Sequence, residues 1–316
     1  MRWLAILLCA LLAAPLALAQ QSPTGGATAS ELVQQARQAL GKGDPQQARR
    51  LLEEAVARDS KSPEAWLLLA YCYVSLHQPE EAERFARRAL AGGGGEPALL
   101  ALANILQMQG RDLEVIQLLE ARQAEFSSSA KYLFTLGLSH YHNGGYARAT
   151  ELFDRALALD PSLAQAHYLE GNALARLGKP ELALTHYQQA VRLAPQNSLY
   201  SFQLGQLHSG LGDKARAEAE LRRSVELDPS YAQARYELAK IYFESSRDDA
   251  AREQLERAIR SDAKFDGSYY LLSQVYARLG RPEDAQRMLK QFQAIKRHRQ
   301  EEQRALIQKS AEGPKP

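Results

Sequence analysis

Histidine and cysteine are the residue types in this 316-residue chain best suited to metal binding or catalysis, but their spacing matches no known metal-binding or catalytic motif. His140 and His142 stand two residues apart, so on a helix they point in nearly opposite directions and cannot share one metal ion. The glycine run at 92–95 lacks the following Lys-Ser/Thr of a phosphate-binding loop, and no zinc-protease motif, paired-cysteine ligand set or nucleophile elbow occurs. The sequence therefore predicts no metal, no cofactor and no catalytic residue, and it favours a protein that is not an enzyme.

The first 19 residues have the features of an export signal. Arg2 gives a positive start, residues 4–14 form a short apolar core, and a small-x-small site ends at Ala19, after which we expect cleavage. The alternative is an uncleaved membrane anchor, but its apolar run is shorter than the roughly 20 residues that a bilayer requires. Cleavage leaves Cys72 as the only cysteine, which favours a buried structural thiol over a redox sensor. We expect a periplasmic or secreted protein with no stable membrane span.

Composition and charge narrow the class of partner. The chain is 45% hydrophobic and 24% charged, which is ordinary for a globular protein. A formal net charge of +2 gives no electrostatic basis for binding nucleic acid. The sequence therefore predicts no nucleic-acid partner.

Small residues recur with a period of 34 residues. The repeats begin at residues 29, 63, 96, 130, 164, 198, 232 and 266, and one of these steps is 33 residues long. The eighth place of every repeat holds a small residue, and the twentieth place is alanine in all repeats but the third. Glycine takes the fifteenth place in six repeats. Such regularity predicts one structural motif repeated along the chain.

Each repeat is predicted to form two antiparallel helices. Apolar residues in the first half lie on one helix face, as Trp66, Leu69 and Tyr73 do. Glycine at the fifteenth place permits the left-handed backbone that ends a helix, and prolines such as Pro161 close the second helix. The small eighth and twentieth residues let the two helices approach closely. A single hairpin leaves one face unburied, so neighbouring hairpins must stack.

These repeats resemble the tetratricopeptide repeat family, whose unit of 34 residues has this pattern. The clearest copies begin at Ala130 and Ala164, and the third repeat departs most because Val115 and Arg122 replace small residues. The resemblance covers residues 29–299 and implies an all-α, right-handed solenoid of about eight helix-turn-helix hairpins. A polar capping helix is expected to end over 300–309, while 20–28 and 310–316 are expected to be a disordered linker and tail.

The resemblance also implies that the first helix of each hairpin lines a concave groove. The fifth place is aromatic in five consecutive repeats, and the ninth place holds asparagine, glutamine or lysine in five of the eight repeats. The candidate ligand contacts at these places are Phe134, Tyr168, Phe202, Tyr236, Tyr270, Asn104, Asn172, Gln206 and Lys240. In peptide-binding members of the family, an asparagine at the ninth place pairs with a ligand's backbone amide. The rings have a second possible role in packing neighbouring hairpins together, and the sequence leaves both roles open.

Three functions are compatible with this pattern. The favoured one is an exported scaffold that binds a protein or peptide segment in the groove and helps to organise a cell-envelope complex. The second is a protein that holds a glycan strand during polysaccharide export, which requires exposed rings. The third is an enzyme with an unrecognised groove site, although the repeats leave no room for a separate catalytic domain.

Overall fold

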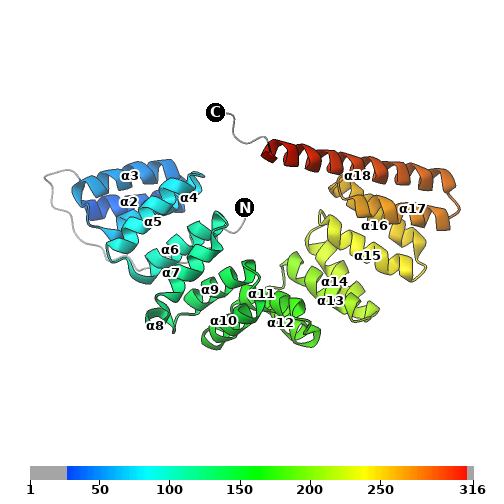
Figure 1. The fold of residues 1–316 in the computed structure, drawn as a ribbon, viewed down its shortest axis with the longest axis horizontal. Coiled ribbons are helices and arrows are strands. Elements are labelled where there is room, and N and C mark those ends of the chain that lie inside the picture. The colour runs from blue at the N-terminus through cyan, green and yellow to red at the C-terminus, as the bar shows by residue number, and fades with distance from the viewer. Residues whose placement is uncertain (1–26, 312–316) are drawn as a thin grey trace. The chain divides into compact units, whose positions relative to one another are not determined.

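The computed structural model describes residues 27–311, and every regular element within that range is an α-helix (Figure 1). The chain divides into two compact units, and the boundary between them in the sequence lies between Pro161 and Ser162. The described part of the first unit contains α2 (Ala29–Gly41), α3 (Pro45–Arg58), α4 (Pro63–Ser75), α5 (Pro79–Ala91), α6 (Gly95–Met108), α7 (Asp112–Glu120), α8 (Gln123–Phe126), α9 (Ala130–His142) and α10 (Tyr146–Leu159). The second contains α11 (Ala164–Arg176), α12 (Pro180–Leu193), α13 (Ser198–Gly210), α14 (Lys214–Leu227), α15 (Ala232–Glu244), α16 (Asp248–Ser261), α17 (Asp266–Arg278) and α18 (Pro282–Ala311).

The described part of each compact unit, residues 27–161 and 162–311, contains four helical hairpins, which confirms the predicted helix-turn-helix architecture. Six of the hairpin turns hold glycine with positive φ, between 70° and 81°, as the pattern of fifteenth places predicts. In the two remaining repeats His77 and Ser246 take the same place, and both have a φ of 58°. A side chain in this left-handed region is costly, so these two turns are local sites of backbone strain.

Close helix contact inside a hairpin depends on matched residue sizes. In the α9–α10 hairpin, a Cβ atom added to Gly137 would lie 2.8 Å from Cε1 of Phe153, a ring that is fully buried. In the α2–α3 hairpin the eighth place is Ala36 and the facing position is the smaller Leu52, both fully buried. In these two hairpins glycine faces the large ring and alanine faces leucine, whereas in the α13–α14 hairpin Gly205 faces Leu221.

The third repeat is irregular, as its sequence indicates. Its second helix α7 stops at Glu120, and the short helix α8 follows after two residues. The third repeat therefore has two short helices where the other repeats have one long second helix. Its first helix α6 begins at Gly95, one residue before the expected start.

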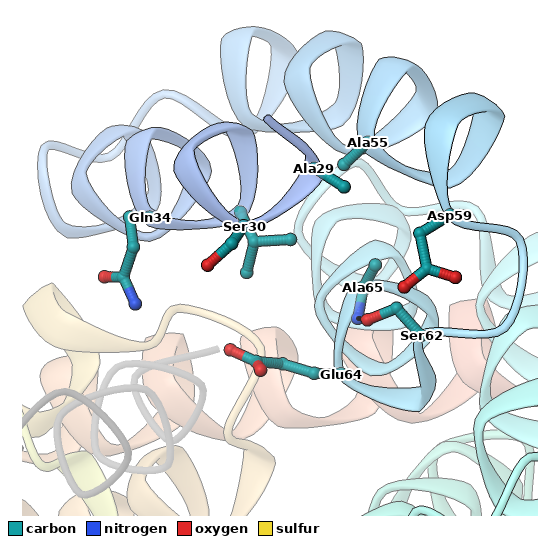
Figure 2. A pocket seen from close by; sticks show the side chains of 9 residues that line it. Ala29, Ser30, Gln34, Ala55, Asp59, Ser62, Glu64 and Ala65 are labelled. Atoms are coloured by element: carbon teal, nitrogen blue, oxygen red, sulfur yellow. Dashed lines mark hydrogen bonds between the residues drawn. The ribbon is translucent and has the colours of Figure 1, made fainter. Parts of the chain in front are cut away.

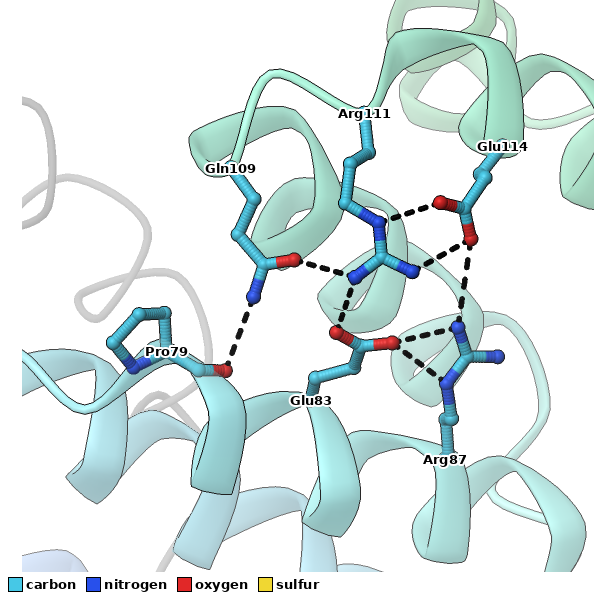
Figure 3. Close-up of polar contacts among 6 residues, drawn as sticks. All are labelled: Pro79, Glu83, Arg87, Gln109, Arg111 and Glu114. Carbon is cyan, nitrogen blue, oxygen red and sulfur yellow. Dashed lines mark hydrogen bonds and ion pairs between the residues drawn. The ribbon is translucent and has the colours of Figure 1, made fainter. Parts of the chain in front are cut away.

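A polar network joins the second and third hairpins (Figure 3). Arg111 lies 2.6 Å from Glu83 and 2.5 Å from Glu114, while Gln109 donates a hydrogen bond to the carbonyl of Pro79. Burial opposes ionisation of Glu83, but the hydrogen bonds from Arg87 and Arg111 prevail and lower the pKa of its carboxyl group. The same register recurs in the second compact unit, where Arg247 lies 2.5 Å from Glu218.

The ends of the described chain differ from expectation by a few residues. Thr28, expected in a disordered linker, caps α2: its hydroxyl accepts a hydrogen bond from the amide of Glu31, whose carboxylate accepts one from the amide of Thr28. At the other end α18 continues to Ala311 rather than stopping at Lys309, so 310–311 are helical. The predicted signal, residues 1–19, and its cleavage site lie outside the described residues. Within 27–311, no helix combines the length and the apolar character needed to cross a membrane.

Candidate functional site

The candidate site is the surface formed by the first helices of the second compact unit, which are α11, α13, α15 and α17. We call it the first-helix face and define it by the fifth and ninth places of these helices: Tyr168, Asn172, Phe202, Gln206, Tyr236, Lys240, Tyr270 and Gln274. Residues four apart on a helix share one side, so the two places of each helix lie on one face. Phe134 and Asn104 occupy the same places in the first compact unit.

The fifth-place rings of the second compact unit pack against other rings. Tyr168 is stacked on Tyr200 at 4.9 Å between ring centroids, and Phe202 lies 4.8 Å from Tyr231. Tyr231 is itself partly buried, and this burial raises the pKa of its phenol to about 12. The packing role that the sequence left open is therefore confirmed for these rings.

The other aromatic candidates also have ring partners but differ in exposure. Tyr236 meets Phe265 edge-on at 5.2 Å, and Tyr270 lies 5.3 Å from Phe292 of α18. Phe202 is only 7% exposed, whereas Tyr270 is 47% exposed. Tyr270 thus offers the largest apolar contact surface among these rings, while Phe202 offers almost none.

In the first compact unit, Phe134 is half-buried and its ring centroid lies 5.8 Å from that of Phe153. Asn104 is half-buried on α6. Both candidates belong to the face of their own unit, and their contact with a ligand stays a prediction.

The ninth-place polar residues are partly engaged within the protein. Asn172 accepts a 2.6 Å hydrogen bond from the hydroxyl of Tyr187, and Gln206 donates one of 3.4 Å to Glu237. Lys240 is exposed and lies 3.9 Å from the same Glu237 carboxylate. An amide has several hydrogen-bonding positions, so Asn172 and Gln206 can each still donate or accept one more hydrogen bond. The face thus combines apolar surface with amide and ammonium groups, which suits an extended protein segment.

A small polar pocket of about 130 Å³ lies beside the first helix of the first compact unit (Figure 2). Ser30 and Gln34 of α2 line one side, and Asp59 and Ser62 line the other. Glu64 also lines it, but its carboxylate already lies 2.6 Å from the Arg37 guanidinium. Sequence analysis did not identify this pocket, because its walls come from two repeats and its side chains follow no motif.

The fold also brings together two histidines and a glutamate that sequence analysis did not group. His167 and Glu170 lie on α11 and His186 lies on α12, with His186 Nδ1 3.3 Å from His167 Nδ1 and 3.4 Å from Glu170 Oε2. In the sequence, this group is indicated only by repeat position: the fourth and twenty-third places of the fifth repeat are both histidine.

The thiol of Cys72 is fully buried on α4, which confirms the structural interpretation. Burial raises its pKa to about 12, so at neutral pH it is a protonated thiol rather than a reactive thiolate.

Models of the tetratricopeptide repeat match residues 39–105, 134–198, 202–267 and 267–291. The chain belongs to the tetratricopeptide repeat family. Proteins of this family generally mediate protein–protein interactions. The repeats thereby account for most of the described helices.

Individual relatives share parts of these repeats. The BBSome complex member BBS4 of Bos taurus is 29% identical over 161 residues, which are 51% of this chain and 31% of that protein. Among solved structures, the Cut9–Hcn1 hetero-tetramer of the APC/C matches with a TM-score of 0.61 at 17% identity, over 76% of this chain and 48% of the other. PilF of Pseudomonas aeruginosa matches with a TM-score of 0.57 at 23% identity, over 64% and 92%.

These similarities concern the fold and the repeats rather than a specific function. The two structures share the fold with this chain at an identity too low to carry function. The chain spans less than a third of the length of the curated relatives it matches first. Tetratricopeptide repeats are therefore common to all of them, while the activities and partners of those longer proteins remain their own.

Proposed function

We propose that this protein is an exported interaction scaffold, and that an extended segment of a partner protein lies along the first-helix face and forms part of a cell-envelope complex. One observation carries the binding part of the proposal. Lys240 and Gln274 are exposed at the ninth places of the successive first helices α15 and α17, and Tyr270 is exposed at the fifth place of α17, equivalent to the half-buried Tyr236 of α15. Family membership supports a protein partner, and the signal-like sequence of residues 1–19 supports export.

The ring contacts favour a protein segment over a glycan strand. Sugar rings stack on exposed aromatic faces, but Tyr168, Tyr236 and Phe202 are half-buried or buried against neighbouring rings. Only Tyr270 among the fifth-place aromatics is exposed, and one ring is a poor platform for a polymer. Amide groups beside partly apolar surface match the alternating polar and apolar character of a peptide.

The binding part is tested with surface variants that spare the packed rings. In Lys240→Glu/Tyr270→Ser, an exposed charge is reversed and an exposed ring is removed; in the control, Arg216→Glu/Arg222→Glu, two exposed charges on α14 are reversed. Circular dichroism first establishes that both variants fold. We expect the first variant to lose a protein that the wild-type chain and the control variant both capture from envelope extracts. Equal capture by all three chains would remove the first-helix face as the binding surface.

Export is tested separately. The chain produced in a bacterium is fractionated and its N-terminal residues are determined. We expect a periplasmic or secreted protein that begins at Gln20. A chain that stays in the cytoplasm and begins at Met1 or Arg2 would contradict export and leave the binding part standing.

A further inference from the structure

The last described helix is much longer than its hairpin requires (Figure 1). α18 has 30 residues, whereas the second helices of the other hairpins in this compact unit, α12, α14 and α16, have 14 each. Every described side chain from Lys296 to Gln308 is exposed. Packing of the hairpin therefore does not account for the second half of α18.

An apolar side chain near the middle of α18 is uncovered. Leu289 occupies the twenty-fourth place of the eighth repeat and is 37% exposed. The same place holds Tyr187, Leu221 and Leu255 in the three preceding repeats, where each is 4% exposed or less. Those three hairpins each pack against the first helix of the next hairpin, whereas no described hairpin follows α18. Leu289 thus has the residue type of a covered position without the cover.

Basic residues surround this exposed position. Residues 287–304 contain six arginines and lysines but two glutamates, although the whole chain has a formal net charge of only +2. Arg299 is paired with Asp266 at 3.1 Å, and Arg287 is paired with Asp284. No carboxylate among the described residues lies within ion-pair distance of the remaining four, which are Lys290, Lys296, Arg297 and Arg304. We call these four residues the basic stripe.

The basic stripe follows one side of α18. Lys290, Arg297 and Arg304 are spaced by seven residues, which is about two helical turns, so they form one line along the helix. Lys296 lies next to this line, one residue before Arg297. Glu301 borders the line between Arg297 and Arg304, so four cations on this side accompany one carboxylate within residues 287–304.

Exposed apolar surface accompanies the basic stripe. Leu289 is seven residues before Lys296 and therefore lies on the same side of the helix. Ile307, which is 67% exposed, is about five helical turns after Leu289 and also lies on this side. Cations between exposed apolar side chains are typical of a helix that lies in the surface of a membrane.

We propose that the basic stripe and Leu289 bind the surface of a membrane that contains anionic lipids. The helix lies along the headgroups, its cations meet the lipid phosphates, and it does not cross the bilayer. This surface is separate from the first-helix face, so the proposal is independent of the partner proposed for that face.

Two other occupants fit the observations less well. A second copy of this chain would bring two basic stripes together, and like charges repel. An acidic protein segment would satisfy the charges but needs a groove for its own apolar side chains. The described side chains of residues 296–308 are exposed and form no groove, which suits a flat lipid surface.

The test measures binding to vesicles of defined composition. One kind contains phosphatidylglycerol and phosphatidylcholine in equal amounts, and the other contains phosphatidylcholine alone. The chain from Gln20 onward is used, because the apolar residues 4–14 would bind vesicles of either kind, and this removes no described residue. We expect co-sedimentation with the anionic vesicles only, strong at about 0.1 M salt and lost at about 1 M salt, where charges are screened.

Two variants and one control locate the binding surface. Each basic residue near an anionic surface strengthens binding about fivefold, so Lys296→Glu/Arg297→Glu should weaken it at least about 25-fold. Glu301→Gln removes the carboxylate beside the stripe and should strengthen binding by up to about fivefold. The control Arg216→Glu/Arg222→Glu makes the same change in net charge on exposed residues of α14 and should bind as the wild type does. Circular dichroism first establishes that all three variants fold.

The outcomes separate the possible occupants. No binding to anionic vesicles, equal binding to both kinds of vesicle, or equal binding by the wild type and Lys296→Glu/Arg297→Glu would overturn the proposal. Equal loss in the α14 control would also overturn it, because net charge rather than α18 would then decide binding. Sedimentation equilibrium without vesicles should show no dimer that depends on the basic stripe. A dimer that Lys296→Glu/Arg297→Glu abolishes would assign this side of α18 to a second copy instead.

Discussion

Replacing Gly137 by alanine tests whether residue size is matched across each hairpin. The new Cβ atom would lie 2.8 Å and 2.9 Å from two atoms of the Phe153 ring and 3.2 Å from Cβ of Leu152. Both side chains are fully buried. Because Phe134 also contacts this ring, with centroids 5.8 Å apart, the ring cannot move without disturbing the fifth-place packing.

Two opposing effects set the magnitude. Overpacking a buried site costs about 1–3 kcal/mol. Replacing a helical glycine by alanine returns about 1 kcal/mol through helix propensity. We therefore expect Gly137→Ala to lower the free energy of unfolding by about 1 kcal/mol.

The matched control is Gly205→Ala on α13, where the facing residue is Leu221. The new Cβ atom would lie 2.8 Å from Cγ of Leu221, but alanine already pairs with leucine at Ala36 and Leu52. The new Cβ atom would also lie 3.2 Å from the backbone nitrogen of Leu221, so both the leucine and α14 have to shift slightly. Because leucine can rotate more easily than the Phe153 ring, we expect the gain in helix propensity, about 1 kcal/mol, to offset this cost and the change to be close to neutral.

The assay is urea unfolding followed by circular dichroism, with hydrogen exchange in α9 and α10 to localise the effect, since repeat proteins unfold in parts. The double variant Gly137→Ala/Phe153→Leu recreates the alanine–leucine pair and should be more stable than the sum of its single changes by about 1 kcal/mol or more. Equal effects of Gly137→Ala and Gly205→Ala, or strictly additive single changes, would refute the size-matching argument.

Three further changes test the turns, the ion pairs and the first cap. Ser246→Gly should raise the free energy of unfolding by up to about 1 kcal/mol in urea titrations, because it relieves the left-handed strain at φ 58° at a smaller entropic cost. Glu218→Gln should flatten the dependence of stability on pH below about pH 4, measured by thermal unfolding. The hydrogen bond from Arg247 is the main cause that lowers the pKa of the Glu218 carboxyl in the folded state. The ionised Glu218 therefore stabilises the fold fully above the pKa it has in the unfolded chain, and this stabilisation is lost as pH falls through its lower pKa in the folded chain. Thr28→Ala should cost about 1 kcal/mol of local stability, seen as faster hydrogen exchange in the first turn of α2, and unchanged exchange there would contradict the capping box.

The helical hairpins could be predicted from the sequence because their determinants are local and repeated. Glycine at the fifteenth place marks six turns, and the small eighth place marks the close helix contacts. His77 and Ser246 were not predicted to adopt left-handed backbone, because serine does not favour it and histidine adopts it far less readily than glycine does. Their turns follow from packing of the flanking helices, which overrides local preference.

The site was only partly predictable, because the same 34-residue period positions both the side chains that pack between helices and those that are exposed to a ligand. The repeat placed Phe202 and Tyr270 at equivalent positions, yet one is buried and the other is exposed. The exposure of each ring depends on its neighbours. Tyr231 packs on Phe202, whereas Tyr270 belongs to the last hairpin, and its aromatic neighbour in the described chain is Phe292 of α18. The contact among His167, Glu170 and His186 was missed because these side chains lie on two helices and form no short motif.

The most direct test of the central claim is site-specific photo-crosslinking in cells. A photoreactive phenylalanine analogue replaces Lys240, Tyr270 or Gln274 on the first-helix face, or Arg216 or Arg222 on α14 as controls. The account predicts covalent adducts with another protein from the first-helix positions and none from the α14 positions. Adducts from α14 alone, or equal adducts from both sets, would contradict the first-helix face as the surface that this protein uses.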